Sequence, residues 1–460
     1  MSPYLCRLNF PLRRFFCTEK NLFELRRGKL FEDTFPHESR NEAAKLLKSK
    51  QQCVYAGFDP TAESLHVGNL LILINLLHWQ RAGHSTIALV GGATGLIGDP
   101  SGRSTERPEL ANQRVEANTN SIKKSIETIF KNHEDFIWKK GKLPPVRVVN
   151  NLEWYKKMDL VHFISHHCRH FRLSRMLSRH SVQSRLNSEQ GMSFTEFTYQ
   201  VFQGYDWLHL YKTYGCSFQV GGNDQMGNIV SGYDLISKEE NVPVYGMTLP
   251  LITSESGDKF GKSAGNAVWL NADKTPPFEL YQFFVRNPDS AVENLLRLLT
   301  FLSDEDIDEI MKKHLQEPHL RAAQQILAEQ VTLLVHGEAG LKLAQLATEA
   351  LYKGDLNSLE QLPKEEIIRL FPGASVSALD SNKSRTILEL ALEANAYNYE
   401  KDARTKIYAG GFYVNMHRMN NPDQVFHPHE FILKNKITLL RTGKKNYIII
   451  NWSSGLTDGK

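Results

Sequence analysis

The stretch from Tyr55 to Asn69 constrains the fold of this chain more than any other. Apolar residues at 54–58 predict a short buried strand, a polar turn follows at Asp59, and leucines at helical spacing then predict a helix. His66 and Asn69 lie three residues apart at the start of that helix. A strand that enters a helix through a polar turn directs backbone N–H groups and the positive end of the helix dipole at one ligand, most often a phosphate. The sequence therefore predicts an anion site at this turn.

A second strand is predicted at 86–90, and it leads into a glycine-rich loop at 91–102. Strand, helix and strand in this order indicate a parallel, Rossmann-like sheet with right-handed crossovers. The glycine spacing differs from G-x-G-x-x-G and no acidic residue follows in the expected position, so hydride chemistry on NAD is not predicted. Asp99 can reach a ligand in the same cleft. Arg103 and Arg107 suit triphosphate oxygens, and the alternative for them is a solvated surface loop.

Three polar residues share one face of a helix that is otherwise rich in aromatic side chains. Tyr199, Gln203 and Asp206 stand at i, i+4 and i+7 within the predicted helix. Buried polar groups in a line require hydrogen-bond partners. The pattern fits the polar end of a small bound molecule, and a buried structural network remains the alternative.

A further strand-to-helix turn follows at 218–228, where the strand ends on two glycines. Asp224 and the backbone of Gly222 could hold the two hydroxyls of a ribose there. Later, Lys259 and Lys262 lie three apart in a glycine-containing loop whose spacing is one residue short of a P-loop. Two such lysines could form a mobile cationic clamp for a leaving pyrophosphate, and the alternative is a flexible surface loop.

Composition and cysteine usage limit the classes of protein that these motifs can serve. At 460 residues and 41% hydrophobic content, the chain is expected to form two to four units. The five cysteines are scattered without a Cys-x-x-Cys pair, which favours a reducing compartment over a disulfide framework. Histidines 162, 166, 167 and 170 flank Cys168, but no second cluster of carboxylate or cysteine ligands accompanies them. We interpret them as a basic helix surface, and no metal site is predicted.

The two ends of the chain have distinct charge patterns. Residues 1–18 are basic and amphipathic, with no acidic residue before Glu19, as in a mitochondrial transit peptide. No stretch approaches the roughly 20 apolar residues of a membrane helix, so we expect a soluble protein imported into the mitochondrial matrix. Residues 371–460 hold 12 Lys and Arg against 8 Asp and Glu, which equals the net charge of +4 of the whole chain. A polyanionic partner or a solvated basic face would each explain this excess.

These motifs together carry a family resemblance. Asp59-Pro-Thr-Ala-Glu-Ser-Leu-His66-Val-Gly68-Asn69 resembles the HIGH signature of class I aminoacyl-tRNA synthetases, and Lys259-Phe-Gly-Lys-Ser263 resembles their KMSKS loop. With the polar residues above, the pattern is similar to tyrosyl-tRNA synthetases of the bacterial and mitochondrial type over nearly all of the chain after the presequence. Asn69 replaces the second histidine of the signature.

The resemblance implies an α/β fold with three domains. A Rossmann-like parallel-sheet catalytic domain at 19–273 would be followed by an α-helical anticodon-binding domain at 274–370 and an α+β, S4-like RNA-binding domain at 371–460. Leucine and alanine at helical spacing in 278–350 agree with the second domain. A helix, turn and strand at 402–415, followed by a hairpin, agree with the third.

The resemblance also implies the reaction and its partners. Tyrosine would be activated by ATP with Mg²⁺ to tyrosyl-adenylate and then transferred to tRNA-Tyr, by a homodimer without a tightly bound cofactor, DNA or membrane. The residues implied for catalysis are Thr61, His66, Asn69, Arg103, Arg107, Lys259 and Lys262. Those implied for tyrosine are Tyr55, Asp59, Asp99, Tyr199, Gln203, Asp206, Gln219 and Gln225, and those for ATP are Asp59, His66, Gly68, Asn69, Gly222, Asp224, Ile252 and Lys262.

Two other classes remain open from the sequence. A tryptophanyl-tRNA synthetase is the nearest alternative enzyme, but an indole would not need Tyr55 paired with Asp206. A non-catalytic RNA-binding or intron-splicing protein on a synthetase scaffold is the other alternative. Intact His66, Asp224 and lysines of the loop argue for retained catalysis.

Overall fold

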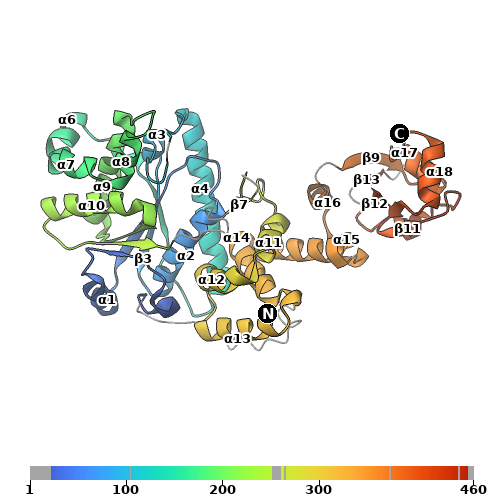
Figure 1. Cartoon of the computed structure of the whole chain (residues 1–460), viewed down its shortest axis with the longest axis horizontal. Coiled ribbons are helices and arrows are strands. Elements are labelled where there is room, and N and C mark those ends of the chain that lie inside the picture. Colours follow the sequence, from blue (N-terminus) through green and yellow to red (C-terminus); the bar gives the residue numbers. More distant parts are fainter. Residues whose placement is uncertain are drawn as a thin grey trace, which may run out of the picture. The chain divides into compact units, whose positions relative to one another are not determined.

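The structure, a computed structural model, describes residues 22–103, 105–250, 261–263, 266–353, 355–371, 374–443 and 446–453 (Figure 1). Its described residues form two compact units. The first comprises the described parts of Met1–Thr275 and Leu280–Gly337, and the second those of Pro276–Glu279 and Glu338–Lys460. The predicted transit peptide, residues 1–18, lies outside the described residues.

A six-stranded sheet organises the first unit, and it confirms the predicted parallel arrangement. Five neighbouring strands are parallel, and the short edge strand β1 is antiparallel to its neighbour. In spatial order the strands are β1 (Thr34–Phe35), β6 (Tyr245–Leu249), β5 (Phe218–Gly222), β2 (Cys53–Phe58), β3 (Ser85–Val90) and β4 (Arg147–Asn150).

The strand order reverses between β2 and β5. The chain runs outward from β2 to β3 through α2 (Val67–Arg81), and outward on the other side from β5 to β6 through α10 (Met226–Glu239). Tyr55 and Gln219 face each other in the register of these two central strands. In open α/β sheets, ligands bind outside the carboxyl ends of the strands where the order reverses. The predicted turn after β2 and the predicted ribose turn after β5 both lie at that point.

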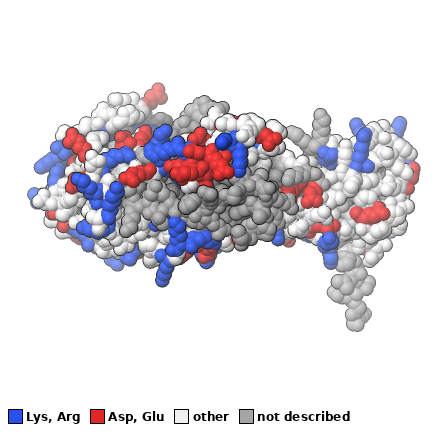
Figure 2. Space-filling model, turned by 90° about the horizontal axis from the view of Figure 1, so that it is seen from below, with Lys and Arg blue, Asp and Glu red and all other residues white. Residues whose placement is uncertain are grey.

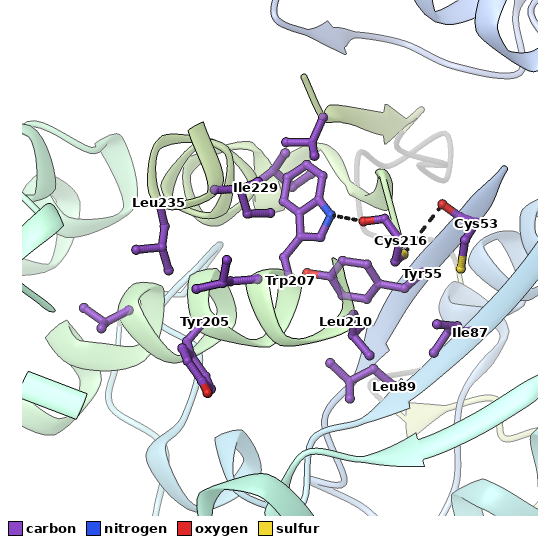
Figure 3. Close-up of a cluster of buried hydrophobic side chains, with 14 of the residues drawn as sticks. Cys53, Tyr55, Ile87, Leu89, Tyr205, Trp207, Leu210, Cys216, Ile229 and Leu235 are labelled. Carbon is purple, nitrogen blue, oxygen red and sulfur yellow. Dashed lines mark hydrogen bonds between the residues drawn. The ribbon is translucent and has the colours of Figure 1, made fainter. Parts of the chain in front are cut away.

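The helix α9 (Phe194–Tyr214) packs beside α10 and closes a buried core against the sheet (Figure 3). Trp207 is fully buried in this core, and its indole Nε1 donates a hydrogen bond to the carbonyl of Cys216 at 3.1 Å. The ring of Tyr55 lies 6.2 Å from that of Trp207. A rigid apolar base of this kind fixes the position of α9, which carries three of the predicted site residues.

The remaining helices of the first unit surround this sheet and extend from it. Arg297 on α12 pairs with Glu293, Asp304 and Asp308. In places on the face shown in Figure 2, blue basic groups lie next to red acidic groups. The helices are α1 (Arg40–Ser49), α3 (Thr94–Ile97), α4 (Asn112–Asn132), α5 (Leu152–Tyr155), α6 (Leu160–His162), α7 (Leu173–Leu177), α8 (His180–Leu186), α12 (Asp289–Leu299) and α13 (Asp304–Gln316). Two helices, α11 (Pro277–Val285) and α14 (Ala322–Thr348), belong partly to each unit. The predicted helical content of 278–350 is confirmed.

The second unit is an α+β fold, as predicted for the C-terminal part. Its sheet has the order β11–β10–β12–β13–β9, in which β9 and β13 pair in parallel and the other described neighbours pair antiparallel. The predicted hairpin is formed by β12 and β13. The elements are α15 (Leu356–Gln361), α16 (Lys364–Leu370), β9 (Ser375–Asp380), α17 (Ile387–Glu393), α18 (Glu400–Tyr408), β10 (Phe412–Val414), β11 (His417–Met419), α19 (Pro428–Phe431), β12 (Ile437–Thr442) and β13 (Asn446–Ser453).

Within the described residues, every helix is too short or too polar to cross a membrane.

A glycine on β6 tests how tightly α10 packs on the sheet. A Cβ added at Gly246 would lie 2.0 Å from Cγ2 of Ile229, which is fully buried. Gly246→Ala is therefore expected to destabilise the fold by about 1–3 kcal/mol, because the buried isoleucine has no room to move. Gly57→Ala on β2 is the matched control, since a Cβ there meets no atom within 4 Å. Urea unfolding midpoints measure both, and equal midpoints would contradict this description of the packing.

Candidate active site

The predicted pair Tyr55 and Asp206 lies buried at the centre of the site. Both side chains are 1% exposed, and the Tyr55 hydroxyl has no hydrogen-bond partner among the described residues. Burial raises the pKa of the Tyr55 phenol well above its usual value, and the nearby Asp206 adds to this effect. Burial likewise raises the pKa of the Asp206 carboxyl to about 7. A phenol and a carboxyl held in a dry site with spare hydrogen-bonding capacity can recognise a hydroxyl group.

Two donors that the sequence did not predict hold the Asp206 carboxylate. Asn151 Nδ2 donates to Oδ2 and Trp154 Nε1 donates to Oδ1, each at 3.0 Å. Asn151 directly follows β4, so it lies at the carboxyl edge of the sheet, and Trp154 lies on α5. Asn151 could have been predicted from the sequence, because a polar residue immediately after a parallel strand often lies at a ligand site. Trp154 left no such signal, because only the folded chain brings α5 beside α9.

Asp59 joins the turn after β2 to two other elements. Its Oδ2 accepts a hydrogen bond from the Tyr199 hydroxyl, and its Oδ1 accepts one from Thr94 Oγ1, both at 2.7 Å. Asn151 Nδ2 also donates to Thr94 Oγ1 at 3.0 Å, so the hydrogen bonds run continuously from Tyr199 to Asp206. Burial raises the pKa of the Asp59 carboxyl to about 6, against the opposing effect of these two hydrogen bonds. A Cβ at Gly91 would lie 2.0 Å from Asp59 Oδ1, so only glycine allows this close approach.

Asp99 and Gln225 meet from opposite sides of the point where the strand order reverses. Gln225 Nε2 donates to Asp99 Oδ2 at 2.7 Å, and burial raises the pKa of the Asp99 carboxyl. Gln219 on β5 is buried, and its Oε1 has no partner among the described residues. Gln203 lies half-buried on α9 between Tyr199 and Asp206. These amides and carboxyls form a polar set around the inner pair.

His66 and Asn69 cap the first turn of α2. The Asn69 Oδ1 accepts a hydrogen bond from the backbone N–H of His66 at 3.1 Å, and the His66 side chain caps the backbone N–H of Asn69 in return. The asparagine that replaces the second histidine of the signature therefore caps the start of α2. Gly68, between them, is exposed at the helix end.

The described end of the predicted lysine loop lies against this same helix turn. A Cβ at Gly261, whose φ is +95°, would lie 3.0 Å from the backbone nitrogen of Gly68. The Val67 N–H donates to the carbonyl of Val268 at 2.9 Å, and the His66 ring lies 6.3 Å from that of Trp269. The described end of the second signature motif thus lies beside the first, although about 190 residues separate the two motifs in the sequence. Lys259 and Ile252 lie outside the described residues, and Lys262 is described only as part of the short strand β7 (Lys262–Ser263).

Thr61, Arg103 and Arg107 line one cavity of about 490 Å³ beside α3. Burial lowers the pKa of the Arg103 guanidinium, and the neighbouring Arg107 adds to this effect. Two adjacent guanidinium groups at a cavity wall attract a polyanion. Gly222 ends β5 half-buried, and Asp224 is exposed in the turn that follows, with its Oδ1 2.8 Å from the position of a Cβ at Gly222.

The raised pKa values of Asp206 and Asp59 predict how ligand binding at this site depends on pH. Both carboxyls titrate above the usual 3.8, at about 7 and about 6 respectively. As the pH falls from about 8 to about 5, both take up protons, and the neutral forms attract a phenol and an ammonium less strongly. We expect the affinity for a ligand with a hydroxyl and an ammonium group to fall in two steps over this range, by up to about tenfold per pH unit below each pKa. Equilibrium dialysis measures it, and constant affinity down to about pH 5 would contradict the assignment.

The chain is similar to proteins of one class throughout its length. Residues 48–353 match the family model of class I tRNA synthetases for tryptophan and tyrosine, and residues 366–450 match the C-terminal domain of SYY-like tyrosine–tRNA ligases. The fold and the site define a class I aminoacyl-tRNA synthetase.

The relatives narrow this class to one amino acid. The mitochondrial tyrosine–tRNA ligase of Drosophila melanogaster is 53% identical over 95% of this chain and 95% of its own length. The mitochondrial tyrosine–tRNA ligase of Homo sapiens is 47% identical over 92% of this chain and 90% of its own length. A C-terminally truncated mitochondrial tyrosyl-tRNA synthetase from Aspergillus nidulans has a TM-score of 0.64 and 34% identity over 70% of this chain and 92% of that structure. The chain belongs to the tyrosine–tRNA ligase family.

Proposed function

We propose that this enzyme activates tyrosine in the crevice between β2 and β5, with the substrate phenol between Tyr55 and Asp206. The observation that carries this proposal is the buried Tyr55 hydroxyl, which has no partner among the described residues, beside a carboxylate that Asn151 and Trp154 hold in place. The phenol of tyrosine would satisfy both groups. Phenylalanine would leave them buried and unpaired, which opposes its binding. The indole of tryptophan has no hydroxyl group for the pair Tyr55 and Asp206, so tryptophan is not favoured.

The polar residues around this pair suit the other end of the amino acid. Asp59 carries a carboxylate that already accepts two hydrogen bonds, and it can attract the substrate ammonium. The remaining residues proposed for the ammonium and carboxyl groups are Asp99, Tyr199, Gln203, Gln219 and Gln225.

Catalysis would depend on position and charge, without a covalent enzyme intermediate. A carboxylate oxygen of tyrosine forms a bond to the α-phosphorus of ATP, the bond from that phosphorus to the bridging oxygen breaks, and pyrophosphate leaves with the electron pair. A ribose hydroxyl at the 3′ end of the tRNA then attacks the tyrosyl carbonyl and releases AMP. Donors that face the developing charge lower both barriers. Those proposed are Thr61, His66, Asn69, Arg103, Arg107, Lys259 and Lys262.

The adenosine would lie across the carboxyl ends of β2 and β5. The exposed backbone at Gly68 leaves room for a flat base, and Asp224 beside Gly222 suits the ribose hydroxyls. Ile252 is the further residue proposed from the family pattern. Mg²⁺ would enter with the phosphates, because it keeps water ligands and takes few protein oxygens. Glu106 and Glu109 line the cavity of Arg103 and can supply such an oxygen.

We also propose the domain division expected from the sequence, with catalysis in 19–273, anticodon binding in 274–370 and RNA binding in 371–460. The basic excess of the last segment favours contact with the phosphates of tRNA-Tyr. The place of action is the mitochondrial matrix. A non-catalytic RNA-binding role alone is not favoured, because the sequence retains His66, Asp224, Lys259 and Lys262.

We further propose a homodimer. Large apolar side chains are exposed on α6, α7 and at the start of α9, where Phe194 is 80% exposed. Figure 1 shows α6, α7 and α8 gathered at one end of the first unit. An apolar face of this kind suits a self-complementary contact with a second copy. Its members are Leu160, Val161, Ile164, Leu173, Leu177, Leu186 and Phe194.

Charging of tRNA tests the proposed function. The full-length enzyme with ATP, tyrosine and mitochondrial tRNA-Tyr should form tyrosyl-tRNA, and His66→Ala should slow the activation step while leaving tyrosine binding unchanged. Absence of charging by the wild-type enzyme would overturn the proposal.

Sedimentation tests the proposed dimer. It should give twice the chain mass for the wild-type protein, and Leu173→Glu should yield monomers. A wild-type protein that stays monomeric at all concentrations would contradict the dimer alone.

A further inference from the structure

Two histidines and a glutamate form a compact cluster on the first unit. His166 and His167 lie in the helical turn Phe163–His167, and Glu239 is the last residue of α10. Their nitrogen and carboxylate oxygen atoms all lie within 4.8 Å of one another. The 14 residues of α10 span about 20 Å at 1.5 Å each, and its first residue adjoins Gln225. The cluster is therefore separate from the proposed active site.

The geometry within the cluster joins one buried pair to one accessible imidazole. His167 Nδ1 lies 2.7 Å from Glu239 Oε1, and these side chains are only 7% and 5% exposed. His166 is exposed, and its ring lies edge-on to that of His167 at 4.9 Å between centroids. The ring of His162, one helical turn earlier, stacks on that of His166 at 5.1 Å. Three imidazoles and a carboxylate thus converge on one small region.

We propose that this cluster binds Zn²⁺ or a similar divalent transition metal through His166, His167 and Glu239. Two imidazoles and one carboxylate are a donor set that Zn²⁺ prefers, with a fourth position open to water or to His162. His162 and His166 also have the i, i+4 spacing that puts two histidines on one metal.

The ligand atoms need only small movements to surround the metal. Bonds of about 2.0–2.2 Å in a tetrahedral site put ligand atoms about 3.3 Å apart. The contact of 2.7 Å between His167 and Glu239 must lengthen slightly, and the distances to His166 must shorten from at most 4.8 Å. The exposed side chain of His166 can rotate to achieve this.

A lysine beside Glu239 does not block the site. Lys212 Nζ contacts Glu239 through Oε2 at 3.3 Å, whereas His167 contacts Oε1. Lys212 also pairs with Glu240 Oε1 at 2.9 Å. A metal on Oε1 therefore leaves the lysine paired on its other side, where it fixes the orientation of the carboxylate.

The competing explanation is a static hydrogen bond between His167 and Glu239 that ties the two segments together without a metal. Calorimetric titration of the metal-free full-length protein with Zn²⁺, followed by Co²⁺ absorption spectra, separates the two. We expect one Zn²⁺ per chain, an intense tetrahedral Co²⁺ spectrum, and a rise in the unfolding temperature with Zn²⁺.

His166→Ala and Glu239→Gln should each weaken Zn²⁺ binding by at least about tenfold and abolish the rise in unfolding temperature. His429→Ala is the matched control, because His429 is an exposed histidine of the second unit with a neighbouring glutamate. If Glu239→Gln fails to fold, the exposed His166 still provides the test. Binding unchanged in His166→Ala, binding lost in the control, or a stoichiometry of one metal per two chains would overturn the proposal.

Discussion

Asp206→Asn is expected to lower kcat/KM for tyrosine activation by about 10- to 150-fold, which corresponds to the loss of a charged hydrogen bond. The carboxylate is buried, and both of its oxygens accept hydrogen bonds from protein donors. An asparagine puts an NH₂ group against one of those donors, so the side chain must turn or lose a contact. Its carboxamide is also a weaker acceptor for the substrate phenol. Phenylalanine should lose far less than tyrosine, so discrimination between the two should narrow.

Trp154→Phe is the matched test of this explanation, because it removes one donor to Asp206 and keeps the carboxylate. The Trp154 hydrogen bond opposes the rise in the pKa of Asp206. Its loss should move the pH midpoint of tyrosine binding upward while the ionised enzyme still binds tyrosine. Steady-state pyrophosphate exchange and binding across the pH range measure both effects. A variant Asp206→Asn with wild-type kcat/KM, or a Trp154→Phe midpoint that shifts downward, would contradict the role given to Asp206.

Arg185→Met is expected to destabilise the fold by about 3–5 kcal/mol, because it leaves a buried carboxylate without its partner. Arg185 Nη2 lies 2.8 Å from Glu196 Oε2, and the two side chains are 0% and 1% exposed. Glu196 lies in the first turn of α9, whose Ser193 cap accepts a hydrogen bond from the Glu196 N–H. The ion pair therefore anchors the start of the helix that carries Tyr199 and Asp206.

The double variant Arg185→Met with Glu196→Leu separates the unpaired charge from the lost packing. It should recover much of the stability lost in the single variant, because apolar side chains replace both charges. Lys131→Met is the surface control, since its pair with Asp135 is largely exposed and should contribute nothing measurable. Urea unfolding midpoints measure all three. If Arg185→Met is at least as stable as the double variant, the unpaired charge of Glu196 is excluded as the cause of the destabilisation.

Local patterns in the sequence predicted the parts of the fold that depend on neighbouring residues. The strand at 54–58, the turn at Asp59 and the helix after His66 all follow from short-range spacing, and the structure confirms them as β2 and α2. The pairing of Tyr55 with Asp206 came from a family pattern. In the structure both side chains are buried, and the Tyr55 hydroxyl has no partner among the described residues.

Other features depend on which strands become neighbours, and spacing does not encode this. Thr94 begins α3, whereas Asn151 and Trp154 lie at and just after the start of α5, and the order β2–β3–β4 puts all three beside Asp59 and Asp206. Glu239 is another example. It lies about 70 residues after the histidines, so the sequence offered no carboxylate for a metal site there. The domain limits remain a prediction, because α11 and α14 are each shared by both compact units.

ATP–pyrophosphate exchange by the purified enzyme without residues 1–18, with tyrosine, phenylalanine and tryptophan supplied in turn, is the decisive measurement for the proposed pocket. We expect exchange with tyrosine alone, its loss in Lys262→Ala, and reduced preference for tyrosine in Asp206→Asn. Exchange with none of the three, or equal exchange with phenylalanine in the wild-type enzyme, would contradict a tyrosine pocket formed by Tyr55 and Asp206.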